Sequence, residues 1–218
     1  MFGKNKISPP QNHSGDYLNI QEIFPTLQGE GPYVGMPAIF IRLGGCNLAC
    51  SFCDTEFESY KKQDLEEIIK EVKDLANEAV KLIVITGGEP LIQPIEKLCQ
   101  NLINSGFLVQ IETNGTLYRD LPSEVKIICS PKVTNGKYHR IRPDLLKRID
   151  AFKFIISSTN PEYADLPDIK TGSAEIFLQP MDEYDKAKNQ QNTELAMRLC
   201  IEGGSRLSIQ THKILGID

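Results

Sequence analysis

Short apolar runs alternate with amphipathic stretches along most of the chain. Apolar residues within 63–79 recur every three or four positions, which predicts a helix with one buried face. Residues 94–105 repeat this spacing up to Gly106, and residues 193–201 repeat it up to Gly203, so a helix is predicted to end before each glycine. The predicted strands are the short apolar runs at 18–24, 38–43, 82–85, 108–111, 125–128, 152–156, 176–178 and 207–209.

This alternation of short buried strands with helices predicts an α/β fold with a mainly parallel sheet. A chain of 218 residues is long enough for one domain with a sizeable core. We assign that domain to residues 17–218 and interpret the polar residues 1–16 as a flexible N-terminal extension. Residues 133–148 contain no long amphipathic helix, so one crossover connection is expected to be short.

Polar clusters follow five of the predicted strands. Because the carboxyl ends of parallel strands meet at one rim of a barrel-like sheet, the side chains there are expected to form a common site. The clusters are Thr86-Gly87-Gly88-Glu89-Pro90, Glu112-Thr113-Asn114-Gly115, Ser130-Pro131-Lys132, Gln179-Pro180-Met181-Asp182 and Gln210-Thr211-His212-Lys213.

Composition narrows the class of protein. The formal net charge of −5 is opposite to the basic surface of a general nucleic-acid binder. No apolar run approaches the length of a bilayer span, and the N-terminus lacks the apolar centre of a secretory signal. We therefore expect a cytoplasmic protein with no nucleic acid and no membrane among its partners. Six cysteines are too few for a disulfide scaffold, and Cys99, Cys129 and Cys200 have the apolar neighbours of buried thiols.

The other three cysteines, Cys46, Cys50 and Cys53, have the spacing C-x3-C-x2-C. Thiolates are soft ligands for iron–sulfur clusters or for zinc. Three thiolates can hold three irons of a cubane and leave the fourth iron open to another ligand. Structural zinc requires four protein ligands, and no fourth ligand is close in the sequence. Three buried thiols without any metal are a further alternative, but the segment is loop-like and not apolar and periodic.

This cysteine spacing, with Phe52 before the last cysteine and Gly-Gly-Glu-Pro at 87–90, resembles the signature of radical S-adenosylmethionine (SAM) enzymes. The resemblance implies an incomplete, modified TIM-like barrel and a 4Fe-4S cluster with one open iron. It also implies that SAM binds this iron and yields a 5′-deoxyadenosyl radical on reduction. The residues it assigns to SAM are Phe52, Cys53, Asp54, Gly88, Glu89, Ser130, Pro131, Lys132, Gln179, Pro180, Met181 and Asp182.

Residues 18–218 also resemble one family within that superfamily, the 7-carboxy-7-deazaguanine synthases. The matching motifs are 22–24, 26–31, 40–42, 53–55 and the clusters at 112–115, 130–132, 179–182 and 210–213. The family implies conversion of 6-carboxy-5,6,7,8-tetrahydropterin to 7-carboxy-7-deazaguanine with loss of ammonia, in the synthesis of queuosine and other deazapurines. It further implies a homodimer, an external electron donor such as flavodoxin, and Mg²⁺ bound by Thr55. The substrate residues implied are Leu27, Gln28, Gly29, Glu30, Arg42, Thr86, His212 and Asp218.

Several of these side chains suit a flat pterin that carries a carboxylate. Arg42 offers a fixed fork of donors to a carboxylate, with pairing to a surface acid as the alternative. Gly29 would allow the backbone to approach the pterin edge closely. His212 is a candidate for proton transfer, since it belongs to a polar cluster at a strand end. Lys153 alternates with apolar neighbours, and this pattern fits an inward-pointing lysine and ordinary sheet alternation equally well.

Two other functions share part of the pattern. A glycyl-radical-enzyme activating enzyme has the same cysteine spacing, but its substrate is a protein backbone and requires an open groove. An iron–sulfur electron carrier or a structural metal protein is the alternative without catalysis, and it would place four protein thiolates on its cluster. The segments 26–31 and 210–213 favour the enzyme that acts on the small pterin.

Overall fold

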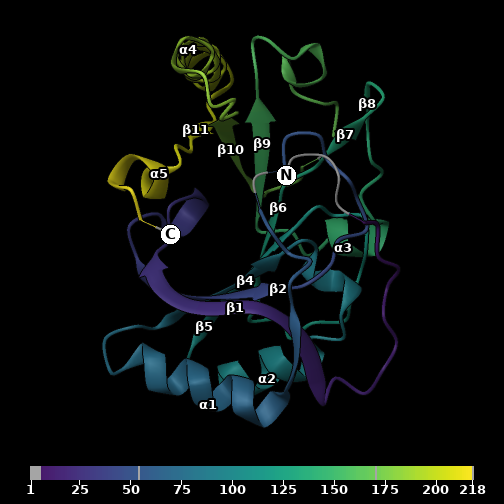
Figure 1. Ribbon diagram of the computed structural model, residues 1–218. Helices are drawn as coiled ribbons and strands as arrows, with labels where there is room; N and C mark the ends of the chain where they lie inside the picture. The colour runs from purple at the N-terminus through teal and green to yellow at the C-terminus, as the bar shows by residue number, and fades with distance from the viewer. Residues whose placement is uncertain (1–5, 54, 170, 218) are drawn as a thin grey trace.

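The structure is a computed structural model that describes residues 6–53, 55–169 and 171–217 (Figure 1). Within these residues the main element is one nine-stranded sheet in the order β11-β10-β9-β6-β5-β4-β2-β1-β3. The strands are β1 (Tyr17–Leu27), β2 (Pro37–Leu43), β3 (Lys61–Asp64), β4 (Leu82–Gly87), β5 (Leu108–Thr113), β6 (Lys126–Cys129), β9 (Ala151–Ile156), β10 (Glu175–Pro180) and β11 (Arg206–Leu207).

The sheet is parallel from β2 to β11, and β1 and β3 add an antiparallel edge. β2 pairs in parallel with β4, while β1 runs antiparallel to both β2 and β3. In the described part of the chain the two outer strands, β3 and β11, do not pair with each other. The sheet is therefore open, and the predicted incomplete barrel with a mainly parallel sheet is confirmed.

Apolar side chains on both faces fix the central strands. The four residues from Leu82 to Ile85 in β4 are fully buried, and every residue of β9 is buried. Continuous apolar runs of this kind are typical of parallel strands that are covered on both faces. The helices that cover the sheet are α1 (Leu65–Ala76), α2 (Glu96–Asn104), α3 (Pro143–Leu146) and α4 (Lys186–Gly203).

The helices lie in separate places along the sheet. α1 and α2 lie together beneath β1, β4 and β5, whereas α4 lies at the opposite end beside β9 and β10 (Figure 1). α1 presents Ile68, Val72 and Ala76 to the core, which is the four-residue spacing that predicted this helix. Its observed bounds are a few residues shorter than the predicted 63–79. No helix in the described ranges is both long and apolar enough to cross a membrane.

α4 begins well before the predicted residue 193. The Asp185 side chain accepts hydrogen bonds from the amides of Ala187 (2.9 Å) and Lys188 (3.0 Å), so it caps the helix N-terminus. The first half of α4 buries Asn192 in place of an apolar residue, which explains why hydrophobic spacing did not reveal it. The helix ends at Gly204, whose positive φ of 67° suits glycine.

Some short elements were not predicted, and one connection is short as expected. β3 consists of Lys, Lys, Gln and Asp, and its ladder with β1 defines it as a strand without any apolar signal. α5 (Thr211–Leu215) has five residues and buries none of them. Between β6 and β9 the structure has only the hairpin of β7 (Val133–Thr134) and β8 (Lys137–Tyr138) and the four-residue α3. The predicted short crossover is therefore confirmed.

Residues 6–16 differ from the flexible extension that their polarity predicted. The Ser8 amide donates to the carbonyl oxygen of Cys46 (2.7 Å), and the Gln11 amide donates to that of Ile92 (2.6 Å). Lys97 in α2 pairs with Asp16 at 2.6 Å. These contacts attach the described part of the extension to the domain, through backbone groups that a composition-based reading cannot detect.

Candidate active site

The carboxyl ends of the parallel strands surround a cavity of about 680 Å³. The end of β1, the loop after β2 and the C-terminal segment around α5 complete its walls. Nineteen of the residues that sequence reasoning assigned to a site line it: Leu27, Gln28, Gly29, Glu30, Arg42, Cys46, Cys50, Phe52, Cys53, Thr55, Thr86, Gly88, Ser130, Lys132, Gln179, Pro180, Met181, Asp182 and His212.

Four other predicted site residues do not line the cavity or cannot be located. Pro131 and Glu89 are buried behind the wall. Asp54 and Asp218 lie outside the described residues. The cavity also has lining residues that sequence reasoning did not assign to a site. Those whose contacts are described below are Glu22, Phe24, Glu112, Thr113, Asn114, Lys153 and Gln210. Four of them, Glu112, Thr113, Asn114 and Gln210, belong to the strand-end clusters found in the sequence.

The cysteine triplet lies on one wall, in the loop that follows β2. The Cys53 amide donates to the Cys50 carbonyl (3.2 Å), which closes a turn, and the Leu48 amide donates to the Cys46 sulfur (3.4 Å). Burial raises the pKa of the Cys46 thiol to about 12, so this thiol ionises when a cation replaces its proton. All six cysteines are free thiols.

The residues present fit a three-thiolate cubane. Among the residues that the structure describes, no three Cys, His, Asp or Glu side chains converge on one point as the ligands of a single ion do. A cubane suits a wider spread because each thiolate binds a different iron. The remaining cysteines, Cys99, Cys129 and Cys200, are buried in α2, β6 and α4 and do not line the cavity. They therefore match the predicted buried thiols and offer the triplet no fourth ligand inside the cavity.

The Gly-Gly-Glu-Pro turn packs directly on the start of the cysteine loop. A Cβ atom at Gly88 would lie 2.2 Å from the Gly45 carbonyl oxygen and 2.7 Å from the Cβ of Cys46, so only glycine fits. The Glu89 amide donates to the same Gly45 oxygen (3.0 Å). The turn and the first cysteine are thus held in one main-chain arrangement.

Glu89 turns its carboxylate into the protein and not into the cavity. It accepts hydrogen bonds from the Leu91 amide (3.0 Å), the Thr113 hydroxyl (2.7 Å) and the Asn114 amide (2.7 Å). Burial raises the pKa of this carboxyl group in spite of these donors. The side chain therefore joins the end of β4 to the end of β5 and supports the turn from behind.

Arg42, at the end of β2, pairs with an acidic side chain and also lines the cavity. Its Nε donates to the Glu22 carboxylate at 2.6 Å, and its guanidinium lies 5.7 Å from the centre of the Phe24 ring. The side chain nevertheless lines the cavity. The contact with Glu22 uses one of its five donor hydrogens, so the same fork can hold an anionic group inside the cavity.

Lys153 points inward from β9 and lies between two acidic side chains. It pairs with Glu30 and, at 2.8 Å, with Glu112, and its own side chain is only 5% exposed. Burial alone would lower the pKa of Lys153, but the two carboxylates outweigh burial and raise it. The alternating pattern fitted an inward-pointing lysine and ordinary sheet alternation equally well. In the structure Lys153 points inward, since Lys153 and Ile155 both line the cavity.

Amide side chains complete this buried charge cluster. Gln179 and Gln210 donate to Glu30 at 3.1 and 2.8 Å. Burial would raise the pKa of Glu30, but Lys153 and these donors bring it to about 2, so the carboxylate stays ionised at neutral pH. On the other acid, Gln28 donates to Glu112 at 3.1 Å. Two carboxylates and one ammonium group leave a net negative charge on this side of the cavity.

The C-terminal segment closes the cavity beside the end of β1, where α5 lies in Figure 1. The Thr211 amide and hydroxyl donate to the Gly29 carbonyl at 3.1 and 3.0 Å. The His212 ring packs on the same glycine, because a Cβ at Gly29 would lie 2.1 Å from its Nδ1. Gly29, Glu30 and His212, which were predicted to share a site, are therefore in contact through this segment.

Lys132 and Phe52, two of the residues assigned to SAM, lie in the loops after β6 and β2. The Lys132 ammonium group donates to the carbonyl (2.8 Å) and hydroxyl (2.6 Å) oxygens of Ser130, and burial lowers its pKa. Phe52 packs edge-on against Tyr163 with ring centres 5.2 Å apart, next to the buried Met181. Gln179 was predicted to line the adenine side, but its side chain donates to Glu30 and so reaches the acidic half of the cavity.

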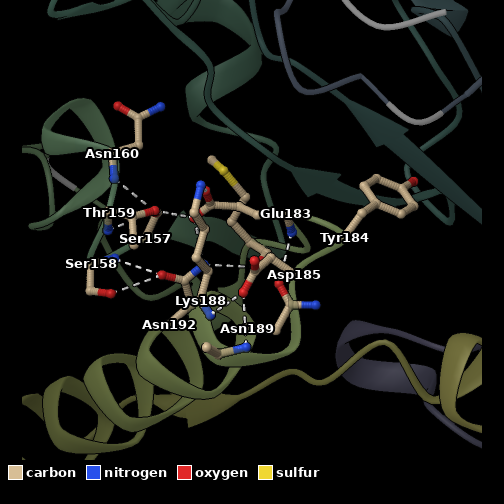
Figure 2. Close-up of polar contacts among 12 residues, drawn as sticks. Ser157, Ser158, Thr159, Asn160, Glu183, Tyr184, Asp185, Lys188, Asn189 and Asn192 are labelled. Atoms are coloured by element: carbon tan, nitrogen blue, oxygen red, sulfur yellow. Dashed lines mark hydrogen bonds and ion pairs between the residues drawn. The ribbon is translucent and has the colours of Figure 1, made fainter.

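A polar network supports the Met181–Asp182 end of this wall from outside, as Figure 2 shows. Asn192 in α4 donates to the Met181 carbonyl (2.9 Å) and to Glu183 (2.9 Å), and it accepts from the Ser158 amide (2.7 Å). Glu183 also accepts from the hydroxyl groups of Ser157 (3.0 Å) and Thr159. The loop after β9, the loop after β10 and α4 therefore meet at one carboxylate.

The fold and the cavity define an enzyme of the radical SAM class. The sequence profile of the Radical SAM superfamily matches residues 40–189, which include the cysteine triplet and every wall of the cavity except the end of β1 and the C-terminal segment. The crystal structure of QueE from Escherichia coli superimposes with a TM-score of 0.73 at 30% sequence identity and covers 89% of this chain and 94% of that chain.

Curated relatives extend this similarity over the whole chain. The 7-carboxy-7-deazaguanine synthase of Rickettsia prowazekii (strain Madrid E) is 53% identical over 100% of this chain and 96% of its own length. The protein of that name from Rhodospirillum rubrum is 40% identical over the full length of both chains. The chain belongs to the 7-carboxy-7-deazaguanine synthase family of the radical SAM superfamily.

Replacing Gly29 with alanine should loosen α5. The added Cβ would overlap the His212 ring, so the ring and the Thr211 hydrogen bonds must shift. We expect amide hydrogen exchange in 211–215 to be faster by about tenfold, as for a short helix that has lost its anchor. Gly203→Ala is the matched control because its Cβ would meet only the Ser205 hydroxyl oxygen, at an ordinary contact distance of 3.8 Å. Equal exchange in both variants would contradict the contact.

Replacing Glu183 with glutamine should change how stability depends on pH. Burial would raise the pKa of Glu183, but the hydrogen bonds from Asn192, Thr159 and Ser157 bring it to about 2, below its usual 4.5. The ionised group therefore stabilises the fold fully above pH 4.5, and this contribution is lost as pH falls toward 2. Urea unfolding should give a variant about 2 kcal/mol less stable at pH 7.

The difference between the wild type and Glu183→Gln should shrink to near zero at pH 2. Glu175→Gln is the control, because its ion pair with Arg206 is half exposed on both sides and should contribute little at any pH. A difference for Glu183→Gln that does not vary with pH would refute the assignment.

Proposed function

We propose that the protein converts 6-carboxy-5,6,7,8-tetrahydropterin to 7-carboxy-7-deazaguanine with loss of ammonia, a step toward queuosine and other deazapurines. The printed names of its relatives support the product. The observation that carries the proposal is the pairing, in one cavity, of an open-sided cysteine triplet with an arginine and two carboxylates. Such a cavity can hold a flat anion that also bears several N–H groups.

On this proposal, Cys46, Cys50 and Cys53 hold a 4Fe-4S cluster, and the rim from Ser130 to Lys132 together with Gly88 and Met181 binds SAM. Cluster and SAM together supply a radical able to remove hydrogen from an unactivated carbon. Gly88 leaves main-chain groups exposed to the methionine part. Phe52 and Met181 provide apolar surface beside the cluster loop, which keeps water from the reacting atoms.

The substrate would lie across the acidic half of the cavity. Arg42 would bind its carboxylate through the part of the fork that Glu22 does not use. Glu30 and Glu112 would accept hydrogen bonds from the N–H groups of the pterin ring, since ionised carboxylates are acceptors only. Lys153 pairs with both carboxylates and lowers the pKa of Glu30. Binding both ends fixes which carbon faces the cofactor.

Thr55 and His212 complete the proposed substrate side. Thr55 lines the cavity two residues after Cys53, and its hydroxyl is a neutral oxygen ligand of the kind that Mg²⁺ accepts. A Mg²⁺ ion there would neutralise the substrate carboxylate together with Arg42. His212 lies on the far wall against Gly29, where its imidazole could take up the proton released when the product becomes aromatic.

Two rival functions fit less well. A glycyl-radical-enzyme activating enzyme must admit a protein backbone, whereas α5 and the end of β1 close this cavity on one side. An electron carrier needs a fourth thiolate on its cluster, and the other cysteines are buried in α2, β6 and α4. The cavity closed on one side and the lack, among the described residues, of a fourth thiolate beside the triplet both fit a small-molecule site next to a cluster with an open iron.

Three wider features belong to the same proposal. A homodimer is supported by exposed apolar residues on α4 and the C-terminal segment, among them Ile201, Ile214 and Leu215. An external reductant would be required because the cluster must gain an electron before SAM can supply its radical, and a small acidic carrier such as flavodoxin would serve. Activity in the cytoplasm is supported by six free thiols, since reducing compartments keep thiols unpaired.

The direct test is to reconstitute the protein anaerobically with iron and sulfide and to incubate it with SAM, a reductant and the tetrahydropterin. Mass spectrometry should detect 7-carboxy-7-deazaguanine and one equivalent of ammonia. Cys46→Ala should lose cluster-dependent cleavage of SAM, because two thiolates cannot hold the cubane in place. Undiminished turnover by that variant would refute the proposal.

Two controls separate the cluster from other causes of inactivity. Cys99→Ala removes a buried thiol outside the cavity and should retain turnover. Thr55→Ala should abolish any stimulation by Mg²⁺ while SAM still binds, because Thr55 lies on the substrate side. Equal stimulation of the wild type and Thr55→Ala would show that magnesium binds elsewhere.

Lys153→Met should impair substrate recognition in a pH-dependent way. Without the ammonium group, burial is no longer outweighed at Glu30, so the pKa of this carboxyl group rises and it takes up a proton at neutral pH. We expect kcat/KM for the pterin to fall about 100-fold, the usual size of effect when one partner of a buried charge cluster is removed.

The residual activity of Lys153→Met should rise from pH 6 to pH 8 as Glu30 ionises, while the wild type changes little. Lys153→Arg keeps the charge and should retain the flat profile. A Lys153→Met enzyme with the pH profile of the wild type would contradict the proposed role.

A further inference from the structure

Residues 7–11 run along the two motifs that define the cofactor site. Ile7 forms a parallel bridge with Cys46, and the Ser8 amide donates to the Cys46 carbonyl at 2.7 Å. Three residues later, the Gln11 amide donates to the Ile92 carbonyl at 2.6 Å. Cys46 begins the cysteine triplet, and Ile92 ends the short turn that follows Gly-Gly-Glu-Pro. One short segment therefore bonds to both motifs.

The two motifs and this segment meet at Gly45. A Cβ atom at Gly45 would lie 2.9 Å from the Ile92 side chain and 3.3 Å from the Ser8 hydroxyl. The φ angle of Gly45 is +85°, a conformation that suits glycine. Its carbonyl accepts from the Glu89 amide at 3.0 Å. Ser8 of this segment therefore lies close to Gly45, the residue that joins the cysteine loop to the Gly-Gly-Glu-Pro turn.

Arg119 fixes the far end of the segment. One of its Nη atoms donates to the carbonyl oxygens of both Gln11 (2.7 Å) and Ile92 (3.1 Å), and its Nε donates to Leu91 (2.9 Å). The side chain is largely buried, 15% exposed, and does not line the cavity. Its Nη1 atom also pairs with Glu96 in α2 at 3.4 Å. A guanidinium that bonds to three carbonyl groups and one carboxylate holds these chain segments together.

We propose that residues 7–11, anchored by Arg119, form a positioning strap that holds Cys46 and the Gly-Gly-Glu-Pro turn in register for the cluster and SAM. A site of this kind must hold its ligands to within about 0.5 Å. Gly45 and Asn47 attach the cysteine loop to neighbouring loops, and the strap adds contacts to the main chain of Cys46 itself. The proposal rests on the proposed cofactor site, but the strap itself can be tested without cluster or SAM. It gives residues of the supposed extension a function in the enzyme.

Ser8→Pro tests the strap with a matched control. Proline removes the amide that donates to Cys46, and it suits the extended conformation of Ile7 that precedes it. Ser8→Ala keeps the amide. In the protein without iron, alkylation of the buried Cys46 by a thiol reagent, followed by peptide mass spectrometry, should be faster in Ser8→Pro by about fivefold, the loss expected for one main-chain hydrogen bond. Ser8→Ala should stay within twofold of the wild type, and Cys99 serves as the internal reference.

A second pair of variants does not alter the segment itself. Arg119→Gln removes the anchor, whereas Arg148→Gln removes a partly buried guanidinium that donates to the Leu121 and Pro122 carbonyl groups, away from the strap. Arg119→Gln should speed alkylation of Cys46 as Ser8→Pro does, and Arg148→Gln should not. After reconstitution, the Kd for SAM should rise about fivefold in Ser8→Pro and Arg119→Gln, with the Kd for the pterin unchanged.

Each outcome decides one question. Faster alkylation of Cys46 in the two strap variants alone supports the strap, and wild-type rates in both overturn it. Equal weakening of SAM and pterin binding would indicate general unfolding and would also overturn it. If the wild type assembles no cluster and binds no SAM, the proposed function fails, while the alkylation rates still decide whether the strap holds Cys46.

Discussion

Close packing of two main-chain segments determines how the site is built. The backbone of Gly87 and Gly88 lies against Leu43, Gly45 and Cys46, at distances that leave no room for a side chain. Because Leu43 and Gly87 are partners in the parallel ladder of β2 and β4, the register of the sheet sets this contact. The first cysteine and the Gly-Gly-Glu-Pro turn are therefore packed against each other, and the sheet holds both in place.

The same register extends to the next strand through a buried acid. Glu89 could have pointed into the cavity, yet its carboxylate joins Thr113 and Asn114 at the end of β5. A buried carboxylate is costly unless its lone pairs are satisfied, and here three donors satisfy them. The Glu89 side chain thus aligns the ends of β4 and β5. The main chain of Gly87 and Gly88, which it supports, lines the cavity.

The acidic half of the cavity depends on the pairing of Lys153 with Glu30 and Glu112. Lys153 and two carboxylates are removed from water together, which is tolerable only because glutamine amides take the remaining lone pairs. One of these amides, Gln210, belongs to the C-terminal segment, so the docking of α5 depends on the charge of Glu30. Another, Gln179, comes from the segment assigned to SAM. The two halves of the cavity are coupled through Glu30.

The sequence predicted the features that depend on local pattern. The cysteine spacing, the strand-end clusters and the short crossover before β9 follow from residue type and period, and the structure has them. β3 and the first half of α4 lack an apolar period. β3 is held by its ladder with β1, and the first half of α4 buries Asn192 in place of an apolar residue. The pairing of Lys153 with Glu30 and Glu112 joins residues more than forty positions apart, or as many as 123, and no local pattern contains that information.

The N-terminal segment illustrates this limit most clearly. Its composition is that of an extension, yet the contacts that fix it are made by the amides of Ser8 and Gln11 and by a distant arginine. Every residue except proline has such an amide, so side-chain pattern cannot show which ones are used. Which amides are used depends on the acceptors available to them. The Cys46 and Ile92 carbonyl groups lie on loops that the sheet already holds in place. A rigid frame can therefore order a segment whose own sequence has no preference, and it does so beside the cofactor site.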